Sequence, residues 1–436
     1  MQDVDRTVEY TPSLDPKSMD RSADPCNDLY QYSCGGWMKN NPIPPDQVRW
    51  SVYGKLYQDN LTMLRTILEQ ATSAKNRDAV NQKIGDYYAA CTNTAAIDQA
   101  GAKPMQHDLD QIAALKSTHD IAPLLASIHL ETEGGGNLFG AGSQQDPDDS
   151  NKVIASLGQG GIGLPDRDYY FKDDAKSKEI RDRYVQHVAK VFELLGDAPA
   201  QAQQEAQTVM RMETALAKTH WTRVEMRDPY KLKNKMSPEQ LADLAPNFDW
   251  QAYFRAANAP AFETVNISTP QFFKGVNAEL ASTPLADWKT YLRFHVANAW
   301  SPFLSTPFSR EAFDFYRAYL RGAKEEQPRW KKCVQWVDQQ LGEALGQAYV
   351  AKTFSPQLKA DTQDMTKRIE EAMKMRIQQL DWMSPETKKA AEVKLAAIRN
   401  KVGYPDKWRD YSSVTITPND FAGNVRSAIV FESHRQ

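Results

Sequence analysis

The sequence has few cysteines, no dominant charge of one sign and no long hydrophobic run. Its 436 residues contain four cysteines, and 53 Lys+Arg stand against 56 Asp+Glu. This near-neutral balance gives no broad basic surface for nucleic acid. The best apolar stretch, residues 121–130, is broken by Pro123 and His129 and is shorter than the ~18–20 residues of a membrane helix. We therefore expect neither nucleic-acid binding nor a membrane segment in this chain.

The cysteines leave two interpretations open. No CxxC motif occurs among the four cysteines, which are Cys26, Cys34, Cys91 and Cys333. This argues against a zinc ribbon or a thioredoxin-type site. They are either buried thiols of a cytosolic protein or members of one or two long-range disulfides in an exported one. Residues 2–25 are polar and acidic, and no signal peptide is visible among them.

Common catalytic motifs are also missing. The seven histidines include no two that are four residues apart, and neither HExxH nor GxSxG occurs. His295 lies in a helix-like apolar run, so we interpret it as a core histidine. Residues 158–163 match GxGxxG after a strand-like segment, but Leu164 and Pro165 follow where a dinucleotide fold needs a helix. We interpret this glycine segment as a structural turn, and the residues alone define no complete catalytic centre.

Helix signals dominate what is present. Ser237-Pro238 and Ser384-Pro385 have the pattern of an N-cap followed by proline, and the second predicts a helix over 385–402 that ends near Gly403. Apolar residues at spacings of three and four from 330 to 348 predict one apolar helix face, and a further long helix is expected over 357–381. Residues 137–142 and 152–157 flank a polar stretch and predict a β-hairpin. The expected class is mainly α.

Several sequence blocks are much more specific. Residues 25–44 contain Cys26, then Tyr32-Ser-Cys34-Gly35-Gly36-Trp37 and Pro42-Ile43-Pro44, which resembles the N-terminal signature of the neprilysin and endothelin-converting enzyme family of zinc metallopeptidases. Further blocks similar to that family follow in order: Gly163–Tyr170, Arg227–Met236, Trp330–Cys333, Val350–Phe354, Trp382–Lys389 and Gly403–Asp410. The resemblance covers about residues 24–412.

The resemblance implies a two-lobed, neprilysin-like architecture around an enclosed cavity. In that family the HExxH motif and the other zinc-site residues follow the region matched here, so zinc would be bound by a part of the enzyme that is not in this chain. We expect a helical cap lobe over 61–410, with a small β-hairpin and elements that pack on the missing thermolysin-like lobe. Residues 1–22 would be a loosely ordered leader, 23–60 a signature segment packing on the catalytic lobe, and 411–436 the truncated start of that lobe.

The family pattern also implies roles for individual residues. Arg49 and Tyr53 correspond to positions that line the primed side of the substrate site, while Tyr57 replaces a second arginine of neprilysin, which favours internal cleavage. Cys91 and Cys333 would pair, closing a loop of about 240 residues for an ideal-chain stabilisation of about 5 kcal/mol. Cys26 and Cys34 would pair with cysteines of the missing C-terminal part.

These implications predict the N-terminal region of a zinc metalloendopeptidase that lies outside the cytoplasm, whether periplasmic, secreted or a membrane-anchored ectodomain. This chain would provide the cap, substrate access and part of the primed-side pocket, and would be inactive alone because it lacks HExxH. Its partners would be the C-terminal catalytic portion and peptide substrates. The alternative is a non-catalytic helical binding or regulatory protein that retains only the cap lobe.

Overall fold

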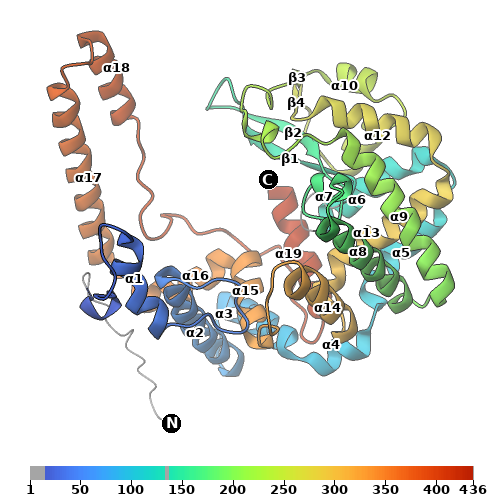
Figure 1. The fold of residues 1–436 in the computed structure, drawn as a ribbon, viewed down its shortest axis with the longest axis horizontal. Coiled ribbons are helices and arrows are strands. Elements are labelled where there is room, and N and C mark those ends of the chain that lie inside the picture. Colours follow the sequence, from blue (N-terminus) through green and yellow to red (C-terminus); the bar gives the residue numbers. More distant parts are fainter. Residues whose placement is uncertain (1–14, 133–136, 436) are drawn as a thin grey trace. The chain divides into compact units, whose positions relative to one another are not determined.

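The protein folds into helices with one small sheet, as the helical signals predict (Figure 1). The structure, a computed structural model, describes residues 15–132 and 137–435. It divides into two compact units: unit 1 comprises residues 1–59, 90–328 and 414–436, and unit 2 comprises residues 60–89 and 329–413. Most of the predicted leader, residues 1–14, lies outside the described residues. None of the helices in the described ranges is both long and apolar enough to cross a membrane.

Unit 1 contains most of the helices and the sheet. Its N-terminal and middle helices are η1 (Pro16–Ser18), α1 (Leu29–Asn40), α4 (Thr94–Ala100), η2 (Lys103–Met105), α5 (Gln106–Ala114), η3 (Thr118–Asp120), α6 (Ile121–Glu131), α7 (Asp168–Phe171), α8 (Ala175–Leu194), α9 (Pro199–Thr219) and η4 (Glu225–Arg227). Its later helices are α10 (Pro238–Leu244), α11 (Trp250–Ala256), α12 (Pro270–Ser282), α13 (Leu285–Trp300), η5 (Ser301–Phe303), α14 (Thr306–Ala312), η6 (Phe313–Tyr319) and α19 (Phe421–Arg435).

The four-stranded sheet of unit 1 contains the predicted hairpin. Strands β1 (Phe139–Gln145) and β2 (Val153–Gln159) pair antiparallel, with Ala141 opposite Leu157, which confirms the hairpin. β2 then pairs in parallel with β4 (Val265–Ile267), and β3 (Lys235–Met236) pairs antiparallel with β4. The strand order is β1-β2-β4-β3, so β1 and β3 are the edges.

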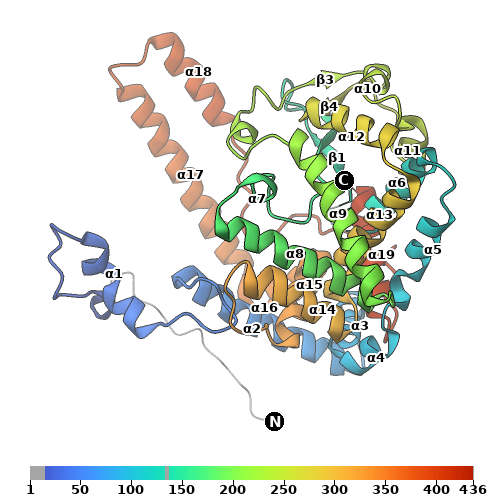
Figure 2. The same ribbon diagram turned by 45° about the vertical axis from the view of Figure 1, so that its right-hand side comes forward.

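Helix α13 forms the centre of the unit 1 core. Trp288, Tyr291, Phe294 and Trp300 on this helix are almost completely buried. The helix packs against α8, α9 and α5, which lie around it in both ribbon views (Figure 2). The antiparallel pair α8 and α9 covers it with apolar side chains of its own. Burial of each large apolar side chain contributes about 1.5–3 kcal/mol to the free energy of folding. The side chains of α13 are therefore a main source of stability for unit 1.

Arg426 holds α19 to the rest of unit 1. Its guanidinium donates to Asp108 at 2.9 and 3.2 Å, to the Pro104 carbonyl at 3.0 Å and to Glu131. The guanidinium carbon also lies over the face of the Trp300 ring, 4.7 Å from the ring centroid. The two carboxylates together compensate the desolvated guanidinium, which fixes the position of α19 against α6.

Unit 2 contains α15 (Arg329–Gln340), α16 (Gly342–Thr353), α17 (Pro356–Gln379) and α18 (Pro385–Ala396), with most of α2 (Val52–Ser73) and α3 (Ala79–Thr92). α17 and α18 form a helical hairpin (Figure 1). The N-cap predictions are confirmed: the side chain of Ser384 accepts from Thr387 N, and in unit 1 Ser237 forms a capping box with Gln240.

Two helix predictions need correction. The apolar face expected from 330 to 348 belongs to two helices, because Leu341 leaves the helical region with φ −126° and ψ 33° and Gly342 follows. The helix expected over 385–402 ends at Ala396. It buries no residue along its length, and Ile398 N bonds to the carbonyl three residues back, at Leu395. The last predicted turn therefore has no packing to stabilise it.

Candidate functional site

Arg49 and Tyr53 lie at the entry to α2. Ser51 begins that helix, since its side chain accepts from Gly54 N at 3.1 Å, and Arg49 precedes it in irregular backbone. Arg49 is exposed, and Tyr53 is 84% exposed. Within residues 15–132 and 137–435 neither side chain has a hydrogen-bond or ion-pair partner of its own. The structure thus leaves a guanidinium fork and a phenol available for an external ligand.

The same segment exposes an unusual number of large apolar side chains. Residues at least half exposed include Leu29, Tyr30, Ile43, Val52 and Leu56. On α2, Val52 and Leu56 are one turn apart, next to Tyr53, so they share one helix face. An apolar strip of this kind usually marks a surface that another protein segment covers.

The α17–α18 hairpin of unit 2 has a similar strip. Leu358, Met365, Ile369 and Met373 follow each other at spacings of seven and four, so they lie along one face of α17, and each is at least 44% exposed. Trp382, between the two helices, is 73% exposed. The sequence predicted a long helix over 357–381 but not this exposed apolar face.

Two of the four cysteines are oxidised to disulfides and two are free thiols. Cys91 and Cys333 are disulfide-bonded. Cys26 and Cys34 are free, and Cys26 is exposed. Asp28 caps α1 through Gln31 N at 2.8 Å, so Cys34 lies on the helix and Cys26 in the turn before it.

A buried carboxylate positions the segment that follows β2. Glu213 on α9 is fully buried and accepts from Tyr170 Oη at 2.6 Å and from Tyr184 Oη at 2.8 Å. His295 Nε2 lies 2.9 Å from Glu213 Oε1, so this histidine is in the core, as predicted. Burial and the neighbouring Glu213 raise the pKa of both tyrosines well above the ordinary value, which keeps their hydroxyls as donors.

The glycine segment 158–163 is a structural turn, as predicted. No helix begins until Asp168, and Gly161 has φ +74°. A side chain at Gly161 would clash with the Leu138 carbonyl at 2.6 Å, and one at Gly163 would meet the Tyr184 ring at 2.8 Å. His220 Nε2 donates to the Gly160 carbonyl at 2.9 Å. The segment is therefore held by tyrosine and histidine side chains, and no helix opens at its glycines as a dinucleotide fold requires.

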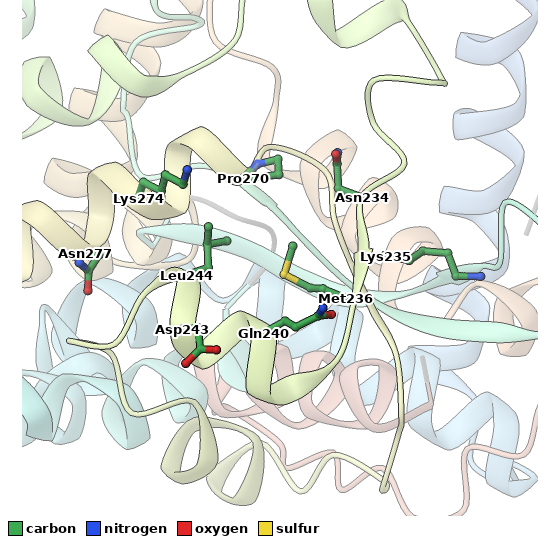
Figure 3. A pocket seen from close by; sticks show the side chains of 9 residues that line it. All are labelled: Asn234, Lys235, Met236, Gln240, Asp243, Leu244, Pro270, Lys274 and Asn277. Atoms are coloured by element: carbon green, nitrogen blue, oxygen red, sulfur yellow. The ribbon is translucent and has the colours of Figure 1, made fainter.

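One pocket of about 660 Å³ lies between β3, α10 and α12. Met236, Leu244 and Lys274 are among its lining residues, and the Lys235 side chain extends away from the other side chains that line it (Figure 3). Lys235 donates to Asp146 at 2.7 and 2.8 Å, which explains its direction. The lining includes a cation, Lys274, and a carboxylate, Asp243, but no histidine or nucleophilic thiol. This pocket has the chemistry of a binding surface rather than of a catalytic centre.

The residues present do not form a zinc site. In the part of the chain that the structure describes, no three His, Cys, Asp or Glu side chains come together in a way that could hold a metal ion.

The family model for Peptidase family M13 matches residues 25–405. Among curated relatives, the chain is 31% identical over 406 residues to an endothelin-converting enzyme homolog of Locusta migratoria, covering 89% of this chain and 55% of that protein. It is 30% identical over 441 residues to Neprilysin-3 of Drosophila melanogaster, covering 95% of this chain and 56% of the relative. The chain thus spans about half the length of the curated relatives it matches.

Solved structures agree with this similarity. The zinc metalloprotease Zmp1 of Mycobacterium tuberculosis, in complex with an inhibitor, matches with a TM-score of 0.88 and 30% identity, over 97% of this chain and 64% of that one. PepO of Lactobacillus rhamnosis HN001 matches in fold with a TM-score of 0.79 at 21% identity.

Proposed function

Because the chain belongs to peptidase family M13, we propose that it forms the helical cap of a zinc metalloendopeptidase. In this proposal the cap controls access to an enclosed cavity, and the complete protein hydrolyses peptides there. The observation that carries it is the family match over residues 25–405, with the similarity in fold to Zmp1, which is a zinc metalloprotease. A closed chamber would admit flexible peptides and exclude folded proteins.

The partner of the two apolar strips is, in this proposal, the C-terminal catalytic portion of the same protein. The matches cover 55% and 56% of the two relatives, so 45% and 44% of their lengths lie outside the matched region. The strip around Val52 and Leu56 and the strip along α17 supply apolar area that such a portion would cover. Residues 23–60 would accordingly pack on the catalytic lobe.

Arg49 and Tyr53 would serve the primed side of the substrate site. Both side chains are exposed and have no partner among the residues that the structure describes, which supports this role. A guanidinium binds a peptide carbonyl or carboxylate, and an aromatic ring packs against an apolar substrate side chain. With Tyr57 in place of a second arginine, the site would accept internal peptide bonds.

Zinc would be bound by residues outside this chain, where it would activate water and polarise the scissile carbonyl. The contribution of this chain is to bind and orient the peptide and to limit access of water and of large substrates.

The cysteine states support an extracytoplasmic location, since disulfides persist in oxidising compartments. We pair Cys91 with Cys333, and Cys26 and Cys34 with cysteines of the C-terminal portion. Disulfide mapping by mass spectrometry of the complete protein tests the pairing. A peptide that links Cys26 to Cys34 would contradict it.

Peptide cleavage by the complete protein tests the proposed function. We expect a quenched fluorescent peptide to be cleaved when this chain is joined to its C-terminal portion, and a chelator to abolish that cleavage. We expect no cleavage by this chain alone. A complete protein that folds and binds peptides but neither binds zinc nor cleaves would instead support the alternative, a non-catalytic binding or regulatory protein.

A further inference from the structure

One arginine lies on a rare type of helix in unit 1, and a second arginine follows just after the end of that helix. η6, residues Phe313–Tyr319, is a π-helix, with Leu320 N bonding to the Phe315 carbonyl five residues back at 3.0 Å. His187 stacks on Phe315 with ring centroids 4.8 Å apart, and Asn298 donates to Tyr316 Oη at 3.1 Å. These contacts hold the wide turn, which carries Arg317, and Arg321 follows it four residues later. Short π-helical segments are frequent at functional sites.

Neither guanidinium has an acceptor in the part of the chain that the structure describes. The contrast with nearby arginines is clear, since Arg310 pairs with Asp314 at 2.9 Å and Arg293 with both Asp197 and Glu205. Arg317 is half-buried and Arg321 is exposed. Burial, and then the like charge of Arg321, lower the pKa of Arg317, and no carboxylate opposes these effects. A half-buried guanidinium beside a second one is unfavourable until an anion neutralises them.

The arginine pair is connected to the segment that carries Arg49. Gly322, with φ +79°, ends the turn, and the amides of Lys324 and Glu325 both donate to the Pro45 carbonyl at 3.0 Å. Lys324 is three residues after Arg321, and Pro45 is four residues before Arg49. At about 3.5 Å per residue, the backbones at Arg321 and Arg49 are therefore less than about 30 Å apart. An extended peptide of about nine residues spans that length.

We propose that Arg317 and Arg321 form an anion subsite that binds a carboxylate of the peptide substrate, away from the bond that is cleaved. This inference rests on the proposed function, because it takes the ligand to be a peptide, and it adds a preference for acidic peptides. A guanidinium pair one turn apart matches a carboxylate through charge-assisted, bidentate hydrogen bonds. The carboxylate belongs either to an acidic side chain or to the C-terminus of the peptide, and these two sources are chemically separable.

Binding of short labelled peptides to this chain tests the subsite without any catalytic step. The peptides differ only in having two central glutamates or two central glutamines, and each is made as a free acid and as a C-terminal amide. We expect fluorescence anisotropy to show at least about tenfold tighter binding of the carboxylate-bearing form, weakening as salt rises. If the glutamine peptide binds more weakly, the carboxylate belongs to an acidic side chain. If the C-terminal amide binds more weakly, it belongs to the C-terminus of the peptide.

Substitutions then locate the preference. We expect the double variant Arg317→Gln/Arg321→Gln to bind acidic and neutral peptides equally. Arg321 is exposed, so Arg321→Gln alone carries little risk to folding. In this variant the ratio of affinities for the acidic and the neutral peptide should fall at least about threefold. Arg255→Gln, at an exposed arginine on α11 that is also without a partner in the described ranges, is the matched control and should keep the full preference.

Three results would overturn the subsite: no detectable binding of the acidic peptide at about 1 mM, equal binding of acidic and neutral peptides, or a preference that persists in the double variant. Any of these leaves the proposed peptidase intact if the complete protein still cleaves neutral peptides. Failure of the complete protein to cleave any peptide would instead remove the proposed function.

Discussion

The core around Glu213 and the segment of residues 29–56 use aromatic and charged side chains in opposite ways. In the core, Tyr170 and Tyr184 both donate to one buried carboxylate, so polar groups are satisfied within unit 1. In the N-terminal segment, Tyr53 and Arg49 are exposed and have no partner among the described residues. The buried cluster around Glu213 therefore stabilises the fold, whereas Tyr53 and Arg49 are available for a ligand or partner.

Removal of the Glu213 carboxylate should give the largest loss of stability. Glu213→Ala leaves the two buried tyrosine hydroxyls without their shared acceptor and removes the carboxylate that lies 2.9 Å from His295, so we expect the free energy of unfolding to fall by about 4 kcal/mol. Urea denaturation followed by circular dichroism measures the change. Glu263→Ala, at an exposed glutamate, is the control and should change it by less than about 0.5 kcal/mol. Similar values for the two variants would refute the role of the buried cluster.

Acid should weaken the same region through His220. Burial lowers the pKa of His220 to about 4, below the ordinary value of 6.5. Between pH 6.5 and 4 the histidine is therefore protonated in the unfolded chain but neutral in the folded chain. The stability that His220 contributes above pH 6.5 is lost as the pH falls through that range. The loss amounts to roughly 3 kcal/mol.

The substitution His220→Gln keeps a donor for the Gly160 carbonyl but does not titrate. We expect the variant to lose less stability than the wild type between pH 6.5 and 4, as measured by urea midpoints at several pH values. Parallel pH profiles for the two proteins would show that His220 is not the titrating group.

A pair of glycines tests the close packing at the turn after β2. We expect Gly163→Ala to cost about 2 kcal/mol, because its new methyl group would overlap the Tyr184 ring. Gly142→Ala is the matched change on β1, where a methyl group meets nothing within 4 Å, and should cost nothing. Thermal unfolding of the two variants provides the comparison, and equal melting temperatures would contradict it.

Substitution of Arg49 should have the smallest effect on stability and a clear effect on substrate binding. Since Arg49 is exposed and has no partner in the described chain, Arg49→Ala should change the free energy of unfolding by less than about 0.5 kcal/mol. In the complete protein we expect KM for short peptides to rise about tenfold with little change in kcat. Arg255→Ala is the control, and an unchanged KM for Arg49→Ala would remove Arg49 from the site.

Local patterns in the sequence predicted much of the fold. The Ser237 capping box, the hairpin around residues 146–152 and the burial of His295 depend on neighbours in sequence or on apolar periodicity, and all three are confirmed. The break at Leu341 was missed because apolar spacing continues through it. The parallel pairing of β2 with β4 joins segments more than a hundred residues apart, which no local pattern encodes.

The candidate site was predictable only in part. Family resemblance drew attention to Arg49 and Tyr53, and the exposure of both is compatible with that role. Arg317 and Arg321 carry no sequence signal, because whether an arginine finds a carboxylate can depend on the fold, as it does for Arg293 with Asp197 and Glu205. The partners of Glu213 were likewise hidden, since Tyr170 and Tyr184 come from different helices.

The central claim is that side chains left exposed in this chain are covered by the C-terminal portion of the complete protein. Oxidative footprinting measures this directly at Tyr53, Met365 and Met373. We predict strong labelling of these residues in this chain alone and protection of all three in the complete protein, with exposed Tyr230 labelled equally in both. Equal labelling of Tyr53, Met365 and Met373 in the two proteins would contradict the account.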